Sequence, residues 1–593
     1  MTDAPTDALL LEAVRSELGP GSTAILADIP PGTLWDHVLS RVATWMGRRI
    51  LLVAADSAVP EIFCLDSEVS PAVIINGDYF ERLATFRLAM FDPALGPVRA
   101  DIVEQLFLET TAMHCLKVGD PDVGALLFQR SLHNRRYFVD TAQPFDASGQ
   151  NLDSSASDLI EGFFPVIHEI GHMNRDTASL IYQTSPISDS SLLKRMEKVL
   201  DSISWMTPEV RDYALEVATR KRTSHILGLD NIRREGYADI FAAQRLYSMA
   251  VGMTQRQSVE FDPVAFMDVL HQEFNVVNVL QRTKLVAGMT KEYPLTAPNA
   301  LAPMLYPVAM ALRSYLMTVG LYGFAKSYLP EQSPVAAEGA LLSEWLRVMG
   351  DQGLVGSMAE CDAGMDRAMN ALTPELILTG RESLDVMRQT FGRSPHARLA
   401  ARGFLARASR LHLDTPLLRA FHAVVADPDG WDGKVEGEVR VYFLLVAVSP
   451  DQESQRLFSV PLEGRARAVC AFTSKETMEV FASGFVAQYL APGETFGAAA
   501  HQVQHIALLE KQVRTELGEP ITFVVEGSDA FGDLVRAVGL KRSGAPADDD
   551  AYAGVRQRAA DAMADRYRLY AVDIADPASL EQFTQIVRLL EDE

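Results

Sequence analysis

The segment VIHEIGHMNRD (residues 166–176) contains the most informative pattern in this chain, His-Glu-Ile-Gly-His at 168–172. On a helix, positions i and i+4 lie one turn apart on the same face, so His168 and His172 can both reach one metal ion. Glu169 is displaced by about 100° around the helix, close enough to touch a metal-bound water without being a ligand. The pattern predicts a metal-binding helix. The alternative is an ordinary helix whose histidines only satisfy hydrogen bonds.

A catalytic zinc ion needs a third protein ligand and an open fourth position for water. The segment NIRREGYADIFAAQRL (231–246) offers Glu235 and Asp239, four positions apart on one face of a predicted helix. Glu235 can bind the metal, and Asp239 can accept the free ring N–H of a ligand histidine and so fix its tautomer. An amphipathic helix with a solvated acidic face is the alternative. Together, the two segments predict one Zn²⁺ ion bound by His168, His172 and Glu235.

The runs HEIGHMNRDT (168–177) and REGYADIFA (234–242) resemble the gluzincin metallopeptidases, most closely the group that contains HtpX and the CAAX prenyl protease. The resemblance implies the same three zinc ligands, with Glu169 as the general base and Asp239 as the partner of a ligand histidine. The segment SPAVIINGDYFERL (70–83) is similar to the edge strand, turn and helix upstream of the family's active-site helix. The stretch from there to the zinc motif is longer than in that family, and clear transmembrane helices are missing. The resemblance therefore does not extend to the substrate.

This ligand set predicts a zinc-dependent metallopeptidase that hydrolyses peptide bonds in a polypeptide substrate. Zinc lowers the pKa of bound water to about 7, and Glu169 can accept the proton and later deliver it to the leaving amine. An additional oxyanion donor is expected, and the candidates are His225, Tyr237 and His271. The alternative from another class is a zinc-stabilised, catalytically silent interaction or regulatory protein. The intact Glu169 argues against it, because a structural site has no use for a base.

Hydropathy patterns predict an α+β protein: a mainly helical, zincin-like metallopeptidase domain with a small edge sheet, then a helical segment and a separate C-terminal α/β domain. The predicted parts are an N-terminal α/β part of the peptidase unit (1–150), its helical zinc-site part (151–330), a helical connector (331–410), a C-terminal α/β accessory domain (411–545) and a helical tail (552–593). A run rich in Asp, Ser and Gln predicts a loop at 139–158. The zinc-site helix is expected at 163–175, started or kinked by Pro165.

Two features of the C-terminal domain were considered for function. The segment 459–484 resembles the strand–FTS–helix signature of SseB-like domains, which would make this part a protein-binding accessory domain; a generic strand–helix unit is the alternative. His501 and His505 would share one face of a helix predicted at 497–517. Gln502 stands where a base would be, so this pair predicts a surface helix and no second zinc site.

Charge and cysteine content set outer limits on the function. The 593 residues include 54 Lys or Arg and 78 Asp or Glu, a net charge of −24. We expect no nucleic-acid partner, because such a surface repels phosphate backbones. An acidic surface around a zinc cleft would favour basic or neutral polypeptides. The four cysteines lie far apart, and the N-terminus lacks the basic start of an export signal, so a reducing cytoplasm is expected.

One apolar segment raises the question of a membrane. From Leu301 to Ala325 the only charge is Arg313, and the length would span a bilayer. A charge at mid-segment costs about 2.5–3.5 kcal/mol on insertion scales, and Pro303 and Pro307 interrupt the first turns. The prediction is a buried helix without a membrane span. An integral membrane peptidase is the alternative.

Overall fold

The computed structural model describes most of the first 328 residues and shorter pieces of the rest. The described residues are 4–19, 21–66, 71–133, 155–174, 187–203, 206–220, 225–257, 261–290, 297–328, 361–368, 384, 387–391, 394–430, 440–447, 455–461, 467–472, 478–479, 482, 495–502 and 521–525. The chain divides into two compact units, and each is described by itself. The first comprises Met1–Met369 with Arg393–Thr415, and the second comprises Asn370–Gly392 with Pro416–Glu593.

The first unit contains a four-stranded mixed sheet with strand order β1-β2-β4-β3. Its strands are β1 (Thr23–Leu26), β2 (Leu51–Asp56), β3 (Ile62–Leu65) and β4 (Ala72–Asn76). The central strands β2 and β4 run parallel, while β1 and β3 pair antiparallel at the two edges. All residues of β4 are buried, as expected for a strand with helices on both faces of its sheet.

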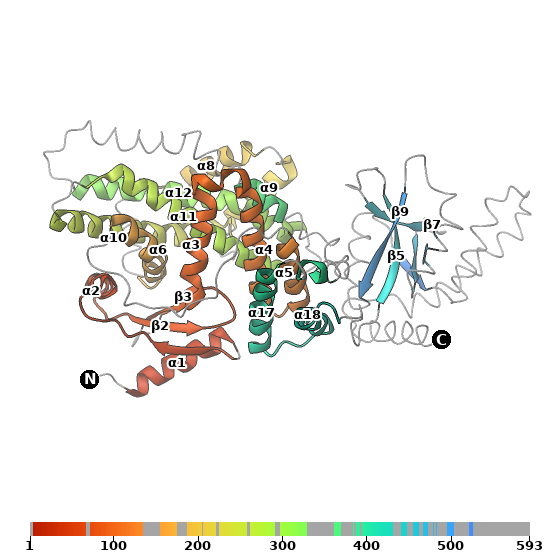
Figure 1. The fold of residues 1–593 in the computed structure, drawn as a ribbon. Coiled ribbons are helices and arrows are strands. Elements are labelled where there is room, and N and C mark those ends of the chain that lie inside the picture. The colour runs from red at the N-terminus through yellow and green to blue at the C-terminus, as the bar shows by residue number, and fades with distance from the viewer. Residues whose placement is uncertain are drawn as a thin grey trace, which may run out of the picture. The chain divides into compact units, whose positions relative to one another are not determined.

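Helices cover both faces of this sheet (Figure 1). On one side, α1 (Ala4–Leu18) packs Leu10, Val14 and Leu18 against a face that includes Val53 and Ile74. On the other side lies the helical body, from which α3 (Gly77–Phe91) contacts β2 and α6 (Ala156–His172) contacts β3 and β4. The sheet thus places its edge strand β3 directly against α6, which carries the first histidine motif.

The helical body is formed mainly by long helices that pack side by side. Its other helices are α2 (Leu34–Met46), η1 (Pro93–Val98), α4 (Arg99–Val118), α5 (Pro121–His133), α8 (Asp189–Asp201), α9 (Pro208–Thr219), α10 (Leu229–Gln257), α11 (Pro263–Thr290), α12 (Ala297–Tyr328) and α17 (Pro395–Arg410). Helix α10 packs against both α6 and α12, and α11 packs against α4, α6 and α12. The first unit is therefore mostly helical with one small sheet, and the predicted α+β class is confirmed at that level.

The second unit contains α18 (Pro416–Ala426) and a mixed sheet. Its strands are β5 (Arg440–Ala447), β6 (Gln455–Leu457), β7 (Ser459–Pro461), β8 (Arg467–Phe472), β9 (Thr495–Gln502) and β10 (Ile521–Val525). Strands β10, β8, β5 and β6 follow one another across the sheet, β7 adds to β8, and β9 adds to β5. Among the strands described in this unit, only the β10–β8 pairing is parallel. The SseB-like resemblance of this unit stays a prediction.

The structure differs from the prediction where two helices were expected to begin. The zinc-site helix begins at Ala156, so the end of the loop predicted at 139–158 is helical. The helix predicted at 497–517 begins as strand β9, which pairs with β5 over its whole length. The predicted tail (552–593) lies outside the described residues, and α17 falls within the range predicted as a connector. None of the helices described is both long and apolar enough to cross a membrane.

Candidate metal centre

Helix α6 is capped at its N-terminus and holds a proline in its interior. The Ser155 side chain accepts from the Asp158 N–H, and the Asp158 carboxylate accepts from the Ser155 N–H, which is a capping box. Pro165 lies inside the helix, so the prediction that it starts the helix was wrong. Proline has no N–H for the carbonyl of Glu161 four residues earlier. Arg87 donates to that carbonyl at 3.5 Å, which compensates for the missing bond.

Small residues let α6 and α10 approach closely beside the site. A Cβ atom at Gly171 would lie 3.0 Å from Cα of Ala238 and 3.3 Å from its Cβ. Such separations are tighter than most Cβ contacts, so α10 would have to shift by a few tenths of an ångström to admit a side chain at this crossing. The glycine of the histidine motif therefore brings the helix that carries His168 and His172 up to the helix that carries Glu235.

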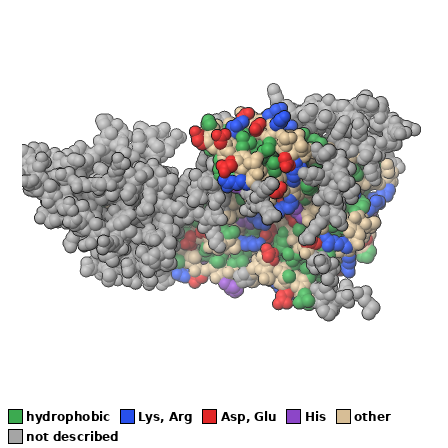
Figure 2. All heavy atoms as spheres, turned by 180° about the vertical axis from the view of Figure 1, so that it is seen from behind, with side chains coloured by type: hydrophobic (Ala, Val, Ile, Leu, Met, Phe, Trp, Pro, Cys, Tyr) green, Lys and Arg blue, Asp and Glu red, His purple; other side chains and the backbone are tan. Residues whose placement is uncertain are grey.

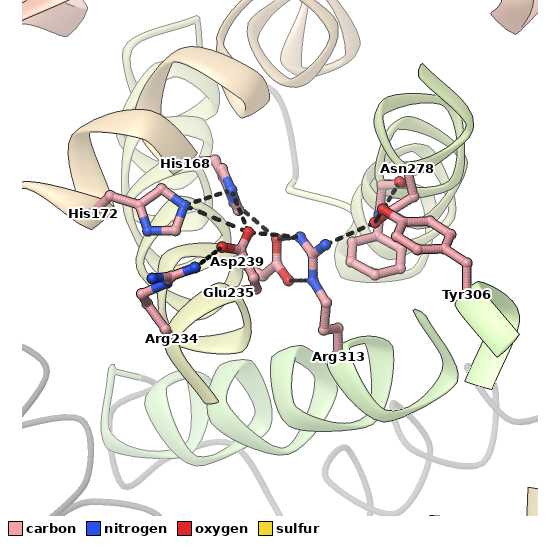
Figure 3. Close-up of polar contacts among 9 residues, drawn as sticks. His168, His172, Arg234, Glu235, Asp239, Asn278, Tyr306 and Arg313 are labelled. Carbon is pink, nitrogen blue, oxygen red and sulfur yellow. Dashed lines mark hydrogen bonds and ion pairs between the residues drawn. The ribbon is translucent and has the colours of Figure 1, made fainter. Parts of the chain in front are cut away.

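The three predicted ligands converge on one point (Figure 3). Nε2 of His168 and Nε2 of His172 lie 3.1 Å apart, and Oε2 of Glu235 lies 3.6 Å from the first and 3.5 Å from the second. A tetrahedral ion with bonds of about 2.0–2.1 Å needs donor atoms about 3.3–3.4 Å apart. The observed separations lie on both sides of this value, so the donor set fits a zinc ion. Within the described part of the chain, these residues form the one group of this kind.

Asp239 orients the first ligand. Its Oδ1 lies 2.9 Å from Nδ1 of His168, and its side chain is fully buried. A carboxylate there favours the tautomer with a proton on Nδ1, which leaves the Nε2 lone pair for a metal. Burial disfavours the charged imidazole, but Asp239 and Glu235 outweigh it and raise the pKa of His168 to about 10 in the metal-free protein. Metal binding therefore has to displace a proton from this ring.

Arg313 of α12 pairs with Asp239 in the interior. Its Nε donates to Oδ2 at 2.8 Å and its Nη2 donates to Oδ1 at 2.9 Å. Its Nη1 donates to Oδ1 of Asn278 at 2.9 Å, and that oxygen also accepts from the Tyr306 hydroxyl at 3.1 Å. All four residues are buried. This network joins three helices and was not predicted from the sequence. Its one signal was the lone charge in an otherwise apolar segment.

The charges around Glu235 keep both site carboxylates ionised. Burial alone would raise the pKa of Glu235, but hydrogen bonds from His168 and His172, with the charge of Arg313, hold it well below its usual range. Burial acts on Asp239 in the same direction, and Arg313 and His168 again outweigh it, so the pKa is lowered. Glu235 is thus available as an anionic ligand, which metal binding requires.

Glu169 lies where α6 meets the edge strand β3. It is buried, and the thiol of Cys64 on β3 hydrogen-bonds to its carboxylate. Burial raises the pKa of Cys64 to about 12, and the charge of Glu169 adds to the effect. Arg48 ties the same two elements together farther along, because its Nη2 donates to the Met173 carbonyl at 2.8 Å and to Asp66 at 2.9 Å. The predicted base therefore sits beside an edge strand that is fixed to its own helix.

The three candidate oxyanion donors have other contacts. His225 Nδ1 accepts from the Leu227 N–H at 3.2 Å, and burial followed by Arg220 lowers its pKa. Arg233 donates to the Tyr237 hydroxyl at 3.4 Å. His271 is buried and stacks on the ring of Phe274, and burial lowers its pKa to about 4. These contacts do not connect the three residues to the zinc ligands, and the oxyanion donor stays a prediction.

No protein-family model, curated protein or solved structure matches this chain. The arrangement of the metal-ligand atoms and of the residues around them is therefore what bears on function. The other histidine pair adds nothing to it. His501 lies in strand β9, where an i, i+4 pair does not share a helical face, and His505 lies outside the described residues.

Proposed function

We propose that this protein is a zinc-dependent metallopeptidase of the gluzincin type, with a zincin-like domain in its first unit. The observation that carries the proposal is the convergence of His168, His172 and Glu235 at tetrahedral spacing, and Glu169 follows His168 directly on the same helix. The resemblance of the two motifs to that family supports the same assignment. The described residues supply three ligands, which leaves a fourth position open for water, as catalytic zinc sites do.

The residues of the chain have separate tasks in this proposal. When bound, zinc would supply an acidified water and a polarised scissile carbonyl. Glu169 accepts the proton of the attacking water and delivers it to the leaving amine. Asp239 holds His168 in its ligand tautomer, and Arg313 holds Asp239. Among the strands described, β3 is an edge of its sheet, so an extended polypeptide could add to it next to Glu169.

The Glu169→Gln variant tests this function. It removes the base and leaves all three ligands, so we expect it to bind one zinc ion per chain and to lose peptide hydrolysis by at least about 100-fold. Zinc is measured by atomic emission after dialysis, and hydrolysis is measured by mass spectrometry on a peptide library. Glu12→Gln on the exposed face of α1 is the matched control and should cleave like the wild type.

Two outcomes would contradict the proposal. If the Glu169→Gln variant cleaves peptides as fast as the wild type, the Glu169 carboxylate is not the base. One tightly bound zinc without cleavage of any library peptide by the wild-type chain would favour a silent, zinc-stabilised protein. His172→Ala tests the ligand set, because it should lose zinc while the remaining fold is retained.

A further inference from the structure

Arg234 stands next to a metal ligand and is exposed to solvent. Its Nη2 lies 3.6 Å from Oε1 of Glu235, and its side chain is 66 % exposed. The preceding residue, Arg233, is 9 % exposed and pairs with Asp189 at the start of α8. Successive residues on a helix point about 100° apart, which explains why one arginine joins two helices while its neighbour faces solvent. Arg234 therefore has no comparable packing role among the described contacts.

The guanidinium lies beside the position of the metal. Both histidine Nε2 atoms are nearest Oε2 of Glu235, so Oε2 is the oxygen that faces the metal. Arg234 approaches the other oxygen, Oε1 (Figure 3). The distance of 3.6 Å is longer than a hydrogen bond, so this contact does not saturate the donors of Arg234. Among the described residues no shorter ion pair of Arg234 is found, so these donors can serve a group that arrives from solvent.

A balance of charges leaves Arg234 in excess. With Zn²⁺ bound, the two positive charges are offset by the carboxylates of Glu235 and Glu169. Asp239 and Arg313 offset each other as a buried ion pair. Among these residues of the centre, Arg234 contributes one net positive charge at the exposed side. Of the residues in this balance, Arg234 has the most exposed side chain.

We propose that Arg234 is a specificity-determining residue that binds a carboxylate of the substrate within one residue of the scissile bond. The proposal rests on the proposed peptidase function. An extended peptide advances about 3.3 Å per residue, so a group adjacent to a bond at the metal falls within reach of a side chain beside Glu235. The planar guanidinium can donate two parallel hydrogen bonds to a carboxylate. The carboxylate can be that of an Asp or Glu side chain or the C-terminus of the substrate.

This inference differs from the one drawn from net charge. The value of −24 favoured basic or neutral polypeptides around the cleft. The guanidinium acts at the scissile bond itself, over a distance shorter than the Debye length of about 8 Å at physiological salt. We therefore expect a local preference for an acidic group even in an acidic protein.

The test uses the full-length, zinc-loaded chain and dansyl hexapeptides of Ala and Leu. One pair carries Glu or Gln next to the central bond, and a second pair ends in a free acid or an amide, which separates the two sources of the carboxylate. We expect the wild type to favour the acidic member of at least one pair by about 10-fold in kcat/KM. Arg234→Gln should abolish the preference, and Arg234→Glu should reverse it. Arg220→Gln, an exposed arginine paired with Glu216 on α9, should keep it.

A binding measurement distinguishes failure of this inference from failure of the peptidase function. The dissociation constants of the same peptides are measured by fluorescence anisotropy on zinc-loaded Glu169→Gln protein, with and without Arg234→Gln. A preference for the acidic peptide that needs Arg234 supports the inference even if no peptide is cleaved. Equal binding of both members of each pair by the protein with Arg234 intact would overturn it. If Arg234→Gln weakens the binding of the acidic and the neutral peptide equally, the inference is also overturned. Such a result would show that Arg234 acts on the reacting atoms or on packing and not on the carboxylate.

Discussion

The guanidinium of Arg313 reaches Asp239 from a helix that contributes no metal ligand. It makes two hydrogen bonds to the carboxylate and one to Asn278. A buried carboxylate that loses its partner is far less stable than the same carboxylate in an ion pair. The residue that orients His168 therefore depends on a residue 74 positions later in the chain.

We expect Arg313→Gln to weaken zinc binding by about 10- to 100-fold, as is typical when support for a ligand is lost. It should also lower the unfolding free energy by about 3–5 kcal/mol, because the buried Asp239 loses the guanidinium that makes two hydrogen bonds to it. Competition with a chelator measures the first effect, and urea unfolding measures the second. Arg367→Gln, whose partners Asp101 and Glu104 lie at the surface, should change neither by more than about 1 kcal/mol. Wild-type zinc affinity in Arg313→Gln would show that Asp239 keeps its position unaided.

Helices α6, α10 and α12 approach one another at glycines. Gly171 faces Ala238 across the α6–α10 crossing, and added Cβ atoms at Gly236 and Gly320 would meet Leu316 at 2.6 Å and Ile240 at 2.8 Å. Cores at native density have little space for such atoms, so Leu316 and Ile240 would have to change their side-chain conformations or the helices would have to separate. The spacing of the metal-ligand atoms thus depends on the close approach of the helices that glycines allow at these crossings.

We expect Gly171→Ala to lower the unfolding free energy by about 1–3 kcal/mol through overpacking against the α10 backbone, and to weaken zinc binding, because His172 is the next residue. Calorimetry and zinc titration would measure these effects. Gly252→Ala on α10 is the control, since nothing lies within 4 Å of its added Cβ and alanine favours a helix by about 0.5–1 kcal/mol. If both substitutions stabilise the protein, the crossing is looser than the structure indicates.

Local patterns predicted the ligand set, because two i, i+4 pairs on helices fix which side chains share a face before any packing is known. Pairings between helices could not be predicted in this way, and Arg313 with Asn278 is the example. The start of α6 was missed although Ser155 and Asp158 are a recognisable capping box. The helix predicted at 497–517 begins instead as strand β9, because its eight-residue pairing with β5 overrides the local sequence pattern.

At the scale of the whole molecule, charges of both signs are spread over the first unit. Figure 2 shows acidic and basic side chains interspersed on the described part of the face seen from behind. In the interior of this unit, two histidines are held neutral. Burial, followed by Lys284 and Lys117, lowers the pKa of His114 to about 3, and burial lowers that of His271 to about 4.

These buried histidines predict that the first unit loses stability in acid. In the unfolded chain His114 is protonated near pH 6.5, whereas in the folded protein it is protonated only near pH 3. The unfolded state therefore binds more protons between these values, and stability falls as the pH drops through them. We expect a loss of about 1.4 kcal/mol per pH unit from each such group. The difference between the urea midpoints at pH 7 and pH 5 should therefore be smaller in His114→Gln than in the wild type. The control His396→Gln, at an exposed histidine, should show the same difference as the wild type. If His114→Gln also shows the wild-type difference, His114 does not contribute to the loss of stability in acid.

The position of Arg313 also has a consequence for biosynthesis. Until α12 has been synthesised, Asp239 lacks its guanidinium partner, and the tendency of α12 to enter a bilayer depends on the hydrophobicity of the segment itself. Arg313 is the single charge between Leu301 and Ala325. Replacing it with leucine would favour insertion of this segment into a bilayer by about 3 kcal/mol, while leaving Asp239 without its partner. One guanidinium thus lowers the tendency of an apolar segment to enter a bilayer and, in the folded unit, neutralises a buried carboxylate.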